Sequence, residues 1–212
     1  MANAKLVIFD CDGVLVDSEP IVNRVFVELL SEIGWFLTYE QAAQLFVGKS
    51  SATCLEIVEQ KLGKPVPPDF LDRCREREVD ALNRELKSVS GIESVLENLT
   101  LPKCVASNSS LRHVHLVLQL TGLIHHFNDK LFSAAQVERP KPFPDVYLHA
   151  AQQMGISPDQ CVVIEDSVSG VQAGCAAGMK VFGYAQQSDR DALTAAGAHL
   201  IFDQMSDLLE LL

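Results

Sequence analysis

Several features are scarce in this sequence, and each scarcity excludes a class of protein. No apolar run approaches the roughly 18 residues that cross a bilayer, and no charged-then-apolar leader opens the chain, so we expect a cytoplasmic protein with no membrane partner. Lys and Arg number 17 against 28 Asp and Glu, for a formal net charge of −11. Nucleic acids are bound through an excess of basic residues, so we expect no nucleic-acid partner either.

Paired cysteines, internal repeats and low-complexity segments are also lacking. The six cysteines are scattered without a Cys-x-x-Cys pair, at positions 11, 54, 74, 104, 161 and 175. We therefore expect reduced thiols and no zinc site built on cysteines. The 212 residues, 48% hydrophobic and 21% charged, suffice to bury a full core in one large domain or two small ones.

The sequence KLVIFDCDG, at residues 5–13, joins a short apolar run to two carboxylates and a glycine. The apolar run predicts a strand over residues 6–9, buried on both faces of a parallel sheet. Asp10 and Asp12 would lie at its carboxyl end, where open α/β sheets bind ligands, and Gly13 would allow a sharp turn. An ordinary strand-to-loop turn explains these nine residues equally well.

The region after Gly13 shows no strand signal for about 70 residues, and its apolar residues have helical spacing instead. Capping and stop residues predict four helices, from Asp17 or Ser18 to Gly34, from Thr38 to near Gly48, from Ser50 or Ser51 to Gly63, and from Asp69 to about Lys87. The run from Thr38 to Gln41 has the form of a capping box.

Strand and helix signals then alternate to the end of the chain. Strands are expected over residues 103–106, 130–133, 161–164, 180–183 and 199–202, with helices between them and a first helix over 90–98 that is capped by Ser90 and Glu93. This alternation predicts a parallel sheet covered on both faces. The expected fold class is α/β, with a Rossmann-like parallel-sheet core (residues 1–15 and 89–212) and an inserted all-helical cap domain (residues 16–88).

Polar side chains follow the strand expected over residues 103–106, at the same edge of the sheet as Asp10 and Asp12. That strand runs into Ser107, Asn108, Ser109 and Ser110, just ahead of a helix. Helix N-termini present unpaired N–H groups that bind anions, so this turn predicts an anion cradle with the Ser107 hydroxyl available. For Ser109 or Ser110, a plain N-cap is the more ordinary role.

Two further strand ends carry charge. Lys141 lies between Pro140 and Pro142, and a stiff backbone that holds an ammonium suits a phosphate or a carboxylate, although a solvated surface lysine is the commoner case. Another buried strand ends in Glu165 and Asp166. Two acid clusters at one edge repel each other unless a cation lies between them, and Mg²⁺ prefers an all-oxygen site.

In this combination and order, the motifs resemble the haloacid dehalogenase superfamily of phosphotransferases, in the branch with a helical cap that includes sugar-phosphate phosphatases and β-phosphoglucomutase. The matching segments are DCDGVLVDSEP at 10–20, SNS at 107–109, RPKPFPD at 139–145 and VIEDSVSGVQAG at 163–174. The resemblance implies that Asp10 is a nucleophile and Asp12 a general acid and base. It further implies that Ser107 and Lys141 bind phosphate, and that Glu165 with Asp166 forms the metal side.

The expected function is that of a Mg²⁺-dependent phosphatase that hydrolyses a small phosphomonoester, a sugar phosphate or sugar-acid phosphate, through an aspartyl-phosphate. Mg²⁺ would be held by Asp10, the backbone carbonyl of Asp12 and Asp166, with Glu165 either a ligand or behind the ligands. Asn108 joins the expected phosphate-binding residues. The sequence contains no indication of oligomeric state.

A mutase of the β-phosphoglucomutase type is the main alternative. In such mutases a cap histidine and a cap arginine delay water and grip the distal phosphate, and ungapped counting places Val22 and Ser51 at these positions. Neither side chain can perform those tasks, which favours hydrolysis. Lys49 is an expected phosphate contact, or equally a solvated turn lysine. A receiver-like or non-catalytic phosphate-binding module and a histidine-based metal protein are more distant alternatives.

Overall fold

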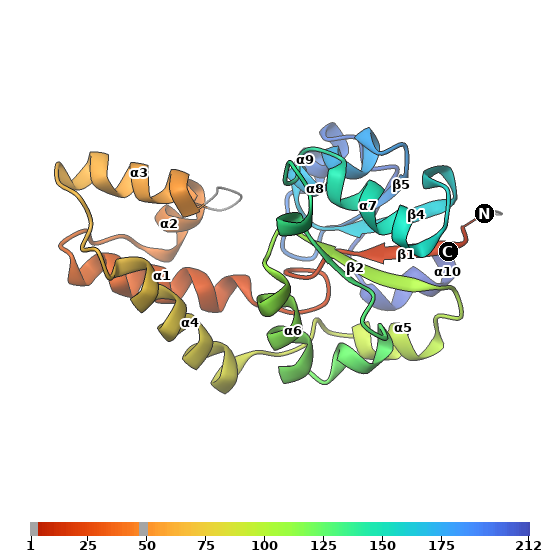
Figure 1. Cartoon of the computed structure of the whole chain (residues 1–212), viewed down its shortest axis with the longest axis horizontal. Coiled ribbons are helices and arrows are strands. Elements are labelled where there is room, and N and C mark those ends of the chain that lie inside the picture. The colour runs from red at the N-terminus through yellow and green to blue at the C-terminus, as the bar shows by residue number, and fades with distance from the viewer. Residues whose placement is uncertain (1–3, 47–50) are drawn as a thin grey trace. The chain divides into compact units, whose positions relative to one another are not determined.

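The computed structural model describes residues 4–46 and 51–212 (Figure 1). The chain forms two compact units, one made of Ser18–Leu86 and the other of Lys87–Leu212 with the residues up to Asp17. The inserted unit is two residues shorter at each end than the expected range of 16–88. Within the described residues no helix is long and apolar enough to cross a membrane, and all six cysteines are free thiols.

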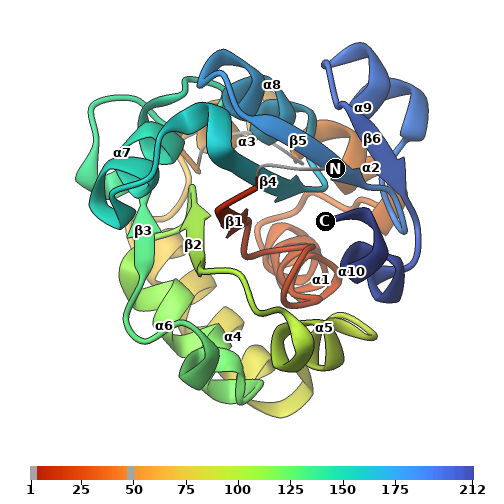
Figure 2. The same ribbon diagram turned by 90° about the vertical axis from the view of Figure 1, so that its right-hand side faces the viewer.

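The larger unit is built on a six-stranded sheet in the order β3-β2-β1-β4-β5-β6 (Figure 2). Every pair of neighbouring strands is parallel, which confirms the predicted fold class. The strands are β1 (Leu6–Phe9), β2 (Lys103–Ser107), β3 (Leu131–Ser133), β4 (Cys161–Glu165), β5 (Lys180–Tyr184) and β6 (Leu200–Phe202). The strand order reverses between β1 and β4, and open sheets bind ligands beyond the carboxyl ends of the strands at such a switch point.

Strand register brings three strand ends together at this point. Phe9 of β1 lies opposite Val105 of β2 and Ile164 of β4. The amide of Asp10 donates to the carbonyl of Ile164 at 2.9 Å, so the pairing continues one residue beyond β1. The side chains that follow these three strands therefore share one small region.

The α-helices that accompany the sheet within the described residues are α5 (Ile92–Asn98), α6 (Leu111–Leu120), α7 (Asp145–Met154), α8 (Val168–Ala176), α9 (Arg190–Ala195) and α10 (Leu208–Leu211). Figure 2 shows α7 and α8 over one face and α5 and α6 over the other. Alternate residues of β1 serve the two faces, since Leu6 and Ile8 belong to the core cluster with Tyr147 of α7, and the ring of Phe9 contacts Phe127. This double coverage explains why β1 reads as a continuous apolar run.

The described residues of the inserted unit form the helices α1 (Glu19–Glu32), α2 (Tyr39–Phe46), α3 (Ser51–Leu62) and α4 (Phe70–Glu85) (Figure 1). Its core contains edge-to-face aromatic contacts of Phe26 with Phe46 and with Phe70. The predicted capping box is confirmed, because the Thr38 hydroxyl accepts from the amide of Gln41 and the Gln41 side chain accepts from the amide of Thr38.

The second predicted capping box, at Ser90 and Glu93, is wrong. The N-cap of α5 is Gly91, in the left-handed region at φ 86°, and no side chain caps the helix. The helix therefore starts at Ile92, so that Glu93 is the second helical residue, one position short of where a capping-box glutamate must lie. Glycine adopts this backbone conformation without steric cost, which explains the shift in register.

Candidate active site

The ammonium of Lys141 lies at the centre of the site and joins three strand ends. Its Nζ donates to Asp10 Oδ1 at 2.6 Å, to Glu165 Oε1 at 2.7 Å and to the Ala106 carbonyl at 2.9 Å. All these groups are buried, and the Lys141 side chain is only 3% exposed. Lys141 is therefore a buried, held ammonium and not the solvated surface lysine that is the commoner case.

Burial and mutual charge control ionisation in this group. Burial raises the pKa of Asp10 to about 7, although the Lys141 ammonium acts in the opposite direction. Burial lowers the pKa of Lys141, but the charges of Asp10 and Glu165 outweigh burial and hold it above its ordinary value. Burial also favours neutral Glu165, but the Lys141 ammonium and the hydrogen bonds from Ser167 and Tyr147 together outweigh burial, so the pKa of Glu165 is lowered. One cation thus faces two buried carboxylates, and Asp10 is the one that lacks full compensation.

Glu165 is fully committed to protein donors. Oε1 accepts from Lys141 Nζ and from the Tyr147 hydroxyl at 2.8 Å, while Oε2 accepts from the Ser167 amide and hydroxyl, both at 2.9 Å. A methyl group on Gly170 would lie only 1.6 Å from Oε1, so a glycine is required for the carboxylate to lie against the start of α8. These contacts fix the orientation of Glu165 and, through it, of Lys141.

Three carboxylates form a candidate metal site. Oxygen atoms of Asp10, Glu165 and Asp166 all lie within 4.8 Å of one another. An all-oxygen donor set of this charge fits Mg²⁺. Gly13 adjoins it at φ +85°, and a methyl group there would lie 2.0 Å from Asp166 Oδ2. Gly13, in the segment 10–20, therefore leaves the space that the Asp166 carboxylate, from the segment 163–174, occupies.

The turn after β2 only partly matches the predicted cradle. Ser107 is buried, but its hydroxyl accepts from the Ser109 amide at 3.0 Å and so is not fully available. The Asn108 side chain binds the backbone of Lys141, accepting from its amide at 2.9 Å and donating to its carbonyl at 3.3 Å. Ser110 is the N-cap of α6. Asn108 thereby connects the cradle to the loop that carries the lysine.

Asp12 is held by two groups that follow β2. Its Oδ2 accepts from the Ser109 hydroxyl at 2.8 Å, and its Oδ1 lies 3.0 Å from His113 Nε2. Asp12 is also close enough to Asp10 for its charge to raise the pKa of Asp10. The two carboxylates of the first motif therefore lie in one site but have different partners.

Sequence reasoning missed Tyr147 and His113 as members of the site. The lysine and proline run of 140–144 pointed to the loop before α7, but nothing in it marked the hydroxyl of Tyr147, which is buried beside Glu165. For His113, the histidine-based metal protein named among the distant alternatives does not indicate Asp12 as a partner. The place of His113 in the first turn of α6, just after the cradle, was the available signal. Lys49, a predicted phosphate contact, lies outside the described residues.

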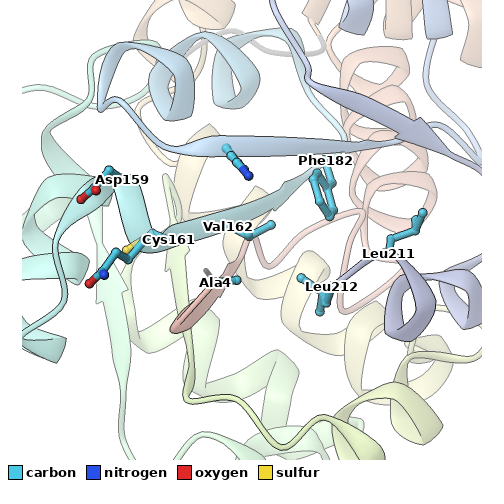
Figure 3. Close-up of a pocket in the computed structure, with 9 residues that line it drawn as sticks. Ala4, Asp159, Cys161, Val162, Phe182, Leu211 and Leu212 are labelled. Atoms are coloured by element: carbon cyan, nitrogen blue, oxygen red, sulfur yellow. The ribbon is translucent and has the colours of Figure 1, made fainter. Parts of the chain in front are cut away.

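The pocket drawn in Figure 3 is unrelated to this chemistry. It is lined by residues at the opposite ends of the strands, among them Ala4 before β1, Cys161 at the start of β4, and Leu211 and Leu212 of the C-terminal segment. None of the charged residues described above lines it. The candidate site is therefore recognised by its convergent polar groups.

Comparison with known proteins agrees with this geometry. Residues 4–178 match the family model described as haloacid dehalogenase-like hydrolase. The chain is 35% identical to the 6-phosphogluconate phosphatase of Escherichia coli, over 86% of this chain and 83% of that protein. It is 31% identical to the fructose-1-phosphate phosphatase YqaB of the same organism, over 81% and 92% of the two chains.

Solved structures extend the match. A haloacid dehalogenase-like protein of unknown function from Agrobacterium tumefaciens superposes with a TM-score of 0.87 at 38% identity, over 98% of this chain and 97% of that one. The similarity thus includes both the α/β unit and the helical unit. The chain belongs to the haloacid dehalogenase-like hydrolase family, and it is a phosphatase of that family.

Proposed function

We propose that the protein is a Mg²⁺-dependent phosphatase that hydrolyses a small phosphorylated carbohydrate, a sugar phosphate or sugar-acid phosphate, through a phosphorylated Asp10. The observation that supports this most is the placement of Asp10. Its carboxylate lies at the switch point of the sheet, bound to Lys141 and within the three-carboxylate cluster. The names of the two Escherichia coli relatives support the substrate class.

In the first step, a carboxylate oxygen of Asp10 attacks the phosphorus in line, and the bond from phosphorus to the substrate oxygen breaks. In the enzyme without substrate, Lys141 holds Oδ1, so we assign the attack to Oδ2. Asp12 donates a proton to the leaving alkoxide. The Ser107 hydroxyl and the backbone N–H group of Asn108 are assigned to the phosphoryl oxygens, because the Ser109 amide already donates to Ser107.

In the second step, water attacks the phosphorus of phospho-Asp10. Asp12, now a carboxylate, accepts the proton from this water, and the bond from Asp10 to phosphorus breaks. Asp10 is thereby regenerated with inorganic phosphate as the second product.

We assign direct metal ligation to Asp10, Asp166 and the backbone carbonyl of Asp12. Glu165 instead positions Lys141, because both of its oxygens already accept hydrogen bonds from protein donors. When bound, Mg²⁺ supplies positive charge that compensates the buried carboxylates and the transferring phosphoryl group. We further propose that the helical unit acts as a cap that selects the substrate.

Hydrolysis is favoured over phosphosugar mutase activity by Val22 of α1, which cannot donate a hydrogen bond.

A screen of phosphorylated carbohydrates, read as phosphate release with Mg²⁺, tests the proposal. Asp10→Asn and excess chelator should each abolish turnover, and acid-quenched wild-type enzyme should carry phosphate on Asp10. Turnover that persists in Asp10→Asn would refute the mechanism, and conversion of β-glucose 1-phosphate to glucose 6-phosphate faster than phosphate release would favour the mutase.

A further inference from the structure

The imidazole of His113 contacts Asp12 and has no task in the mechanism described above. Its Nε2 lies 3.0 Å from Asp12 Oδ1, and the Ser109 hydroxyl donates to the other oxygen at 2.8 Å. Both side chains of the pair are largely shielded, with 27% of the His113 side chain and 23% of the Asp12 side chain exposed. The carboxylate of Asp12 is thus held at both oxygens.

The contact is anchored by local structure. The Ser110 side chain accepts from the amide of His113 at 3.3 Å as the N-cap of α6, which places His113 in the first helical turn. Ser109 is fixed as well, because the buried Ser133 hydroxyl donates to its carbonyl at 2.6 Å. The two groups that hold Asp12 therefore come from one rigid turn, the same turn that forms the anion cradle.

We propose that His113 is a positioning residue that fixes the carboxylate of Asp12 in the orientation required for proton transfer to the leaving group. The inference rests on the proposed function, since it gives Asp12 the role of general acid. Without His113, Oδ1 of Asp12 loses this contact, and the orientation of the carboxylate is less constrained. Proton transfer requires hydrogen-bond reach, so misorientation should slow this step and leave phosphate binding intact.

Leaving-group dependence separates this role from a structural one. p-Nitrophenolate departs without a proton, whereas phenolate and alkoxides are more basic and require general-acid assistance. We would measure kcat/KM with Mg²⁺ for p-nitrophenyl phosphate, phenyl phosphate and glycerol 3-phosphate in full-length wild type and variants. His113→Ala should lower kcat/KM about 10-fold for the two poorer leaving groups and less than about 3-fold for p-nitrophenyl phosphate.

Two matched variants complete the test. His113→Gln keeps a side-chain amide, which can donate or accept a hydrogen bond, near the position of Nε2 and should restore most of the lost rate. His115→Ala removes the same residue type from the same helix, two positions further on and on another face, and should leave the kinetics unchanged. An equal loss for all three esters in His113→Ala, or no loss, would overturn the inference. Failure of the proposed function would instead appear as wild-type turnover that Asp10→Asn does not remove.

Discussion

Asp10→Asn should change the pH dependence of stability as well as activity. The pKa of Asp10 is raised from 3.8 to about 7, mainly by burial. Folded protein therefore holds this proton up to about pH 7, whereas the unfolded chain releases it near pH 4. Stability should consequently fall as pH rises through this window. Because a tenfold difference in proton affinity corresponds to ~1.4 kcal/mol, roughly 1 to 3 kcal/mol should be lost between pH 5 and pH 8 in metal-free protein.

The asparagine removes the titration and keeps the size of the side chain, so the variant should lack this loss. Urea unfolding in chelator at pH 5 and pH 8, followed by far-ultraviolet circular dichroism, measures both proteins. The stability of the variant relative to wild type should increase as pH rises. Saturating Mg²⁺ at pH 8 should reduce this difference in stability, because it compensates the ionised carboxylate of wild type. If the free energy of unfolding changed with pH by the same amount in both proteins, the pKa of Asp10 would not be raised by burial, and the reasoning would be refuted.

Two further substitutions test the supporting contacts. Gly13→Ala should displace the Asp166 carboxylate, since the added methyl group would lie 2.0 Å from Oδ2. We expect kcat to fall more than about 100-fold and calorimetry to show weaker Mg²⁺ binding. Unchanged Mg²⁺ affinity would contradict this prediction. Tyr147→Phe removes the hydroxyl that donates to Glu165 but keeps the ring 4.7 Å from Lys141 Nζ. Urea unfolding should therefore show that the free energy of unfolding falls by about 1 to 2 kcal/mol. Tyr184→Phe, which removes a partly buried hydroxyl, is the control and should lose less. If Tyr147→Phe lost no more stability than Tyr184→Phe, the hydrogen bond from Tyr147 to Glu165 would have no special role.

The fold was predictable because each level of the sequence pattern agreed. Strands that are buried on both faces read as short apolar runs. In the helical unit, Thr38 and Gln41 form the predicted capping box, and Gly34 follows α1 at a φ of 96°. The predicted helix over 90–98 failed only at its start. There the left-handed Gly91 outweighed the side-chain signal of Ser90, because backbone conformation at one glycine depends on its surroundings and leaves little trace in neighbouring residues.

The site was predictable where residues immediately follow a strand. Asp10, Glu165 and Asp166 lie where the carboxyl ends of β1 and β4 place them, and they form the acidic cluster that was expected there. The partners of these acids were not predictable. His113 is separated from Asp12 by 101 residues and Asn108 from Lys141 by 33, and only the register of the parallel strands brings such pairs together.

The saturation of Lys141 has a consequence for how a phosphate enters and leaves. An ammonium has three N–H groups, and here each of them already has a protein acceptor. A phosphate oxygen can therefore bind Lys141 only by exchange, most readily with the carboxylate of Asp10. The net affinity is the difference between two charge-assisted hydrogen bonds, which is much smaller than either bond alone. Departure of inorganic phosphate restores the bond to Asp10, so this lysine can assist transfer without retaining the product.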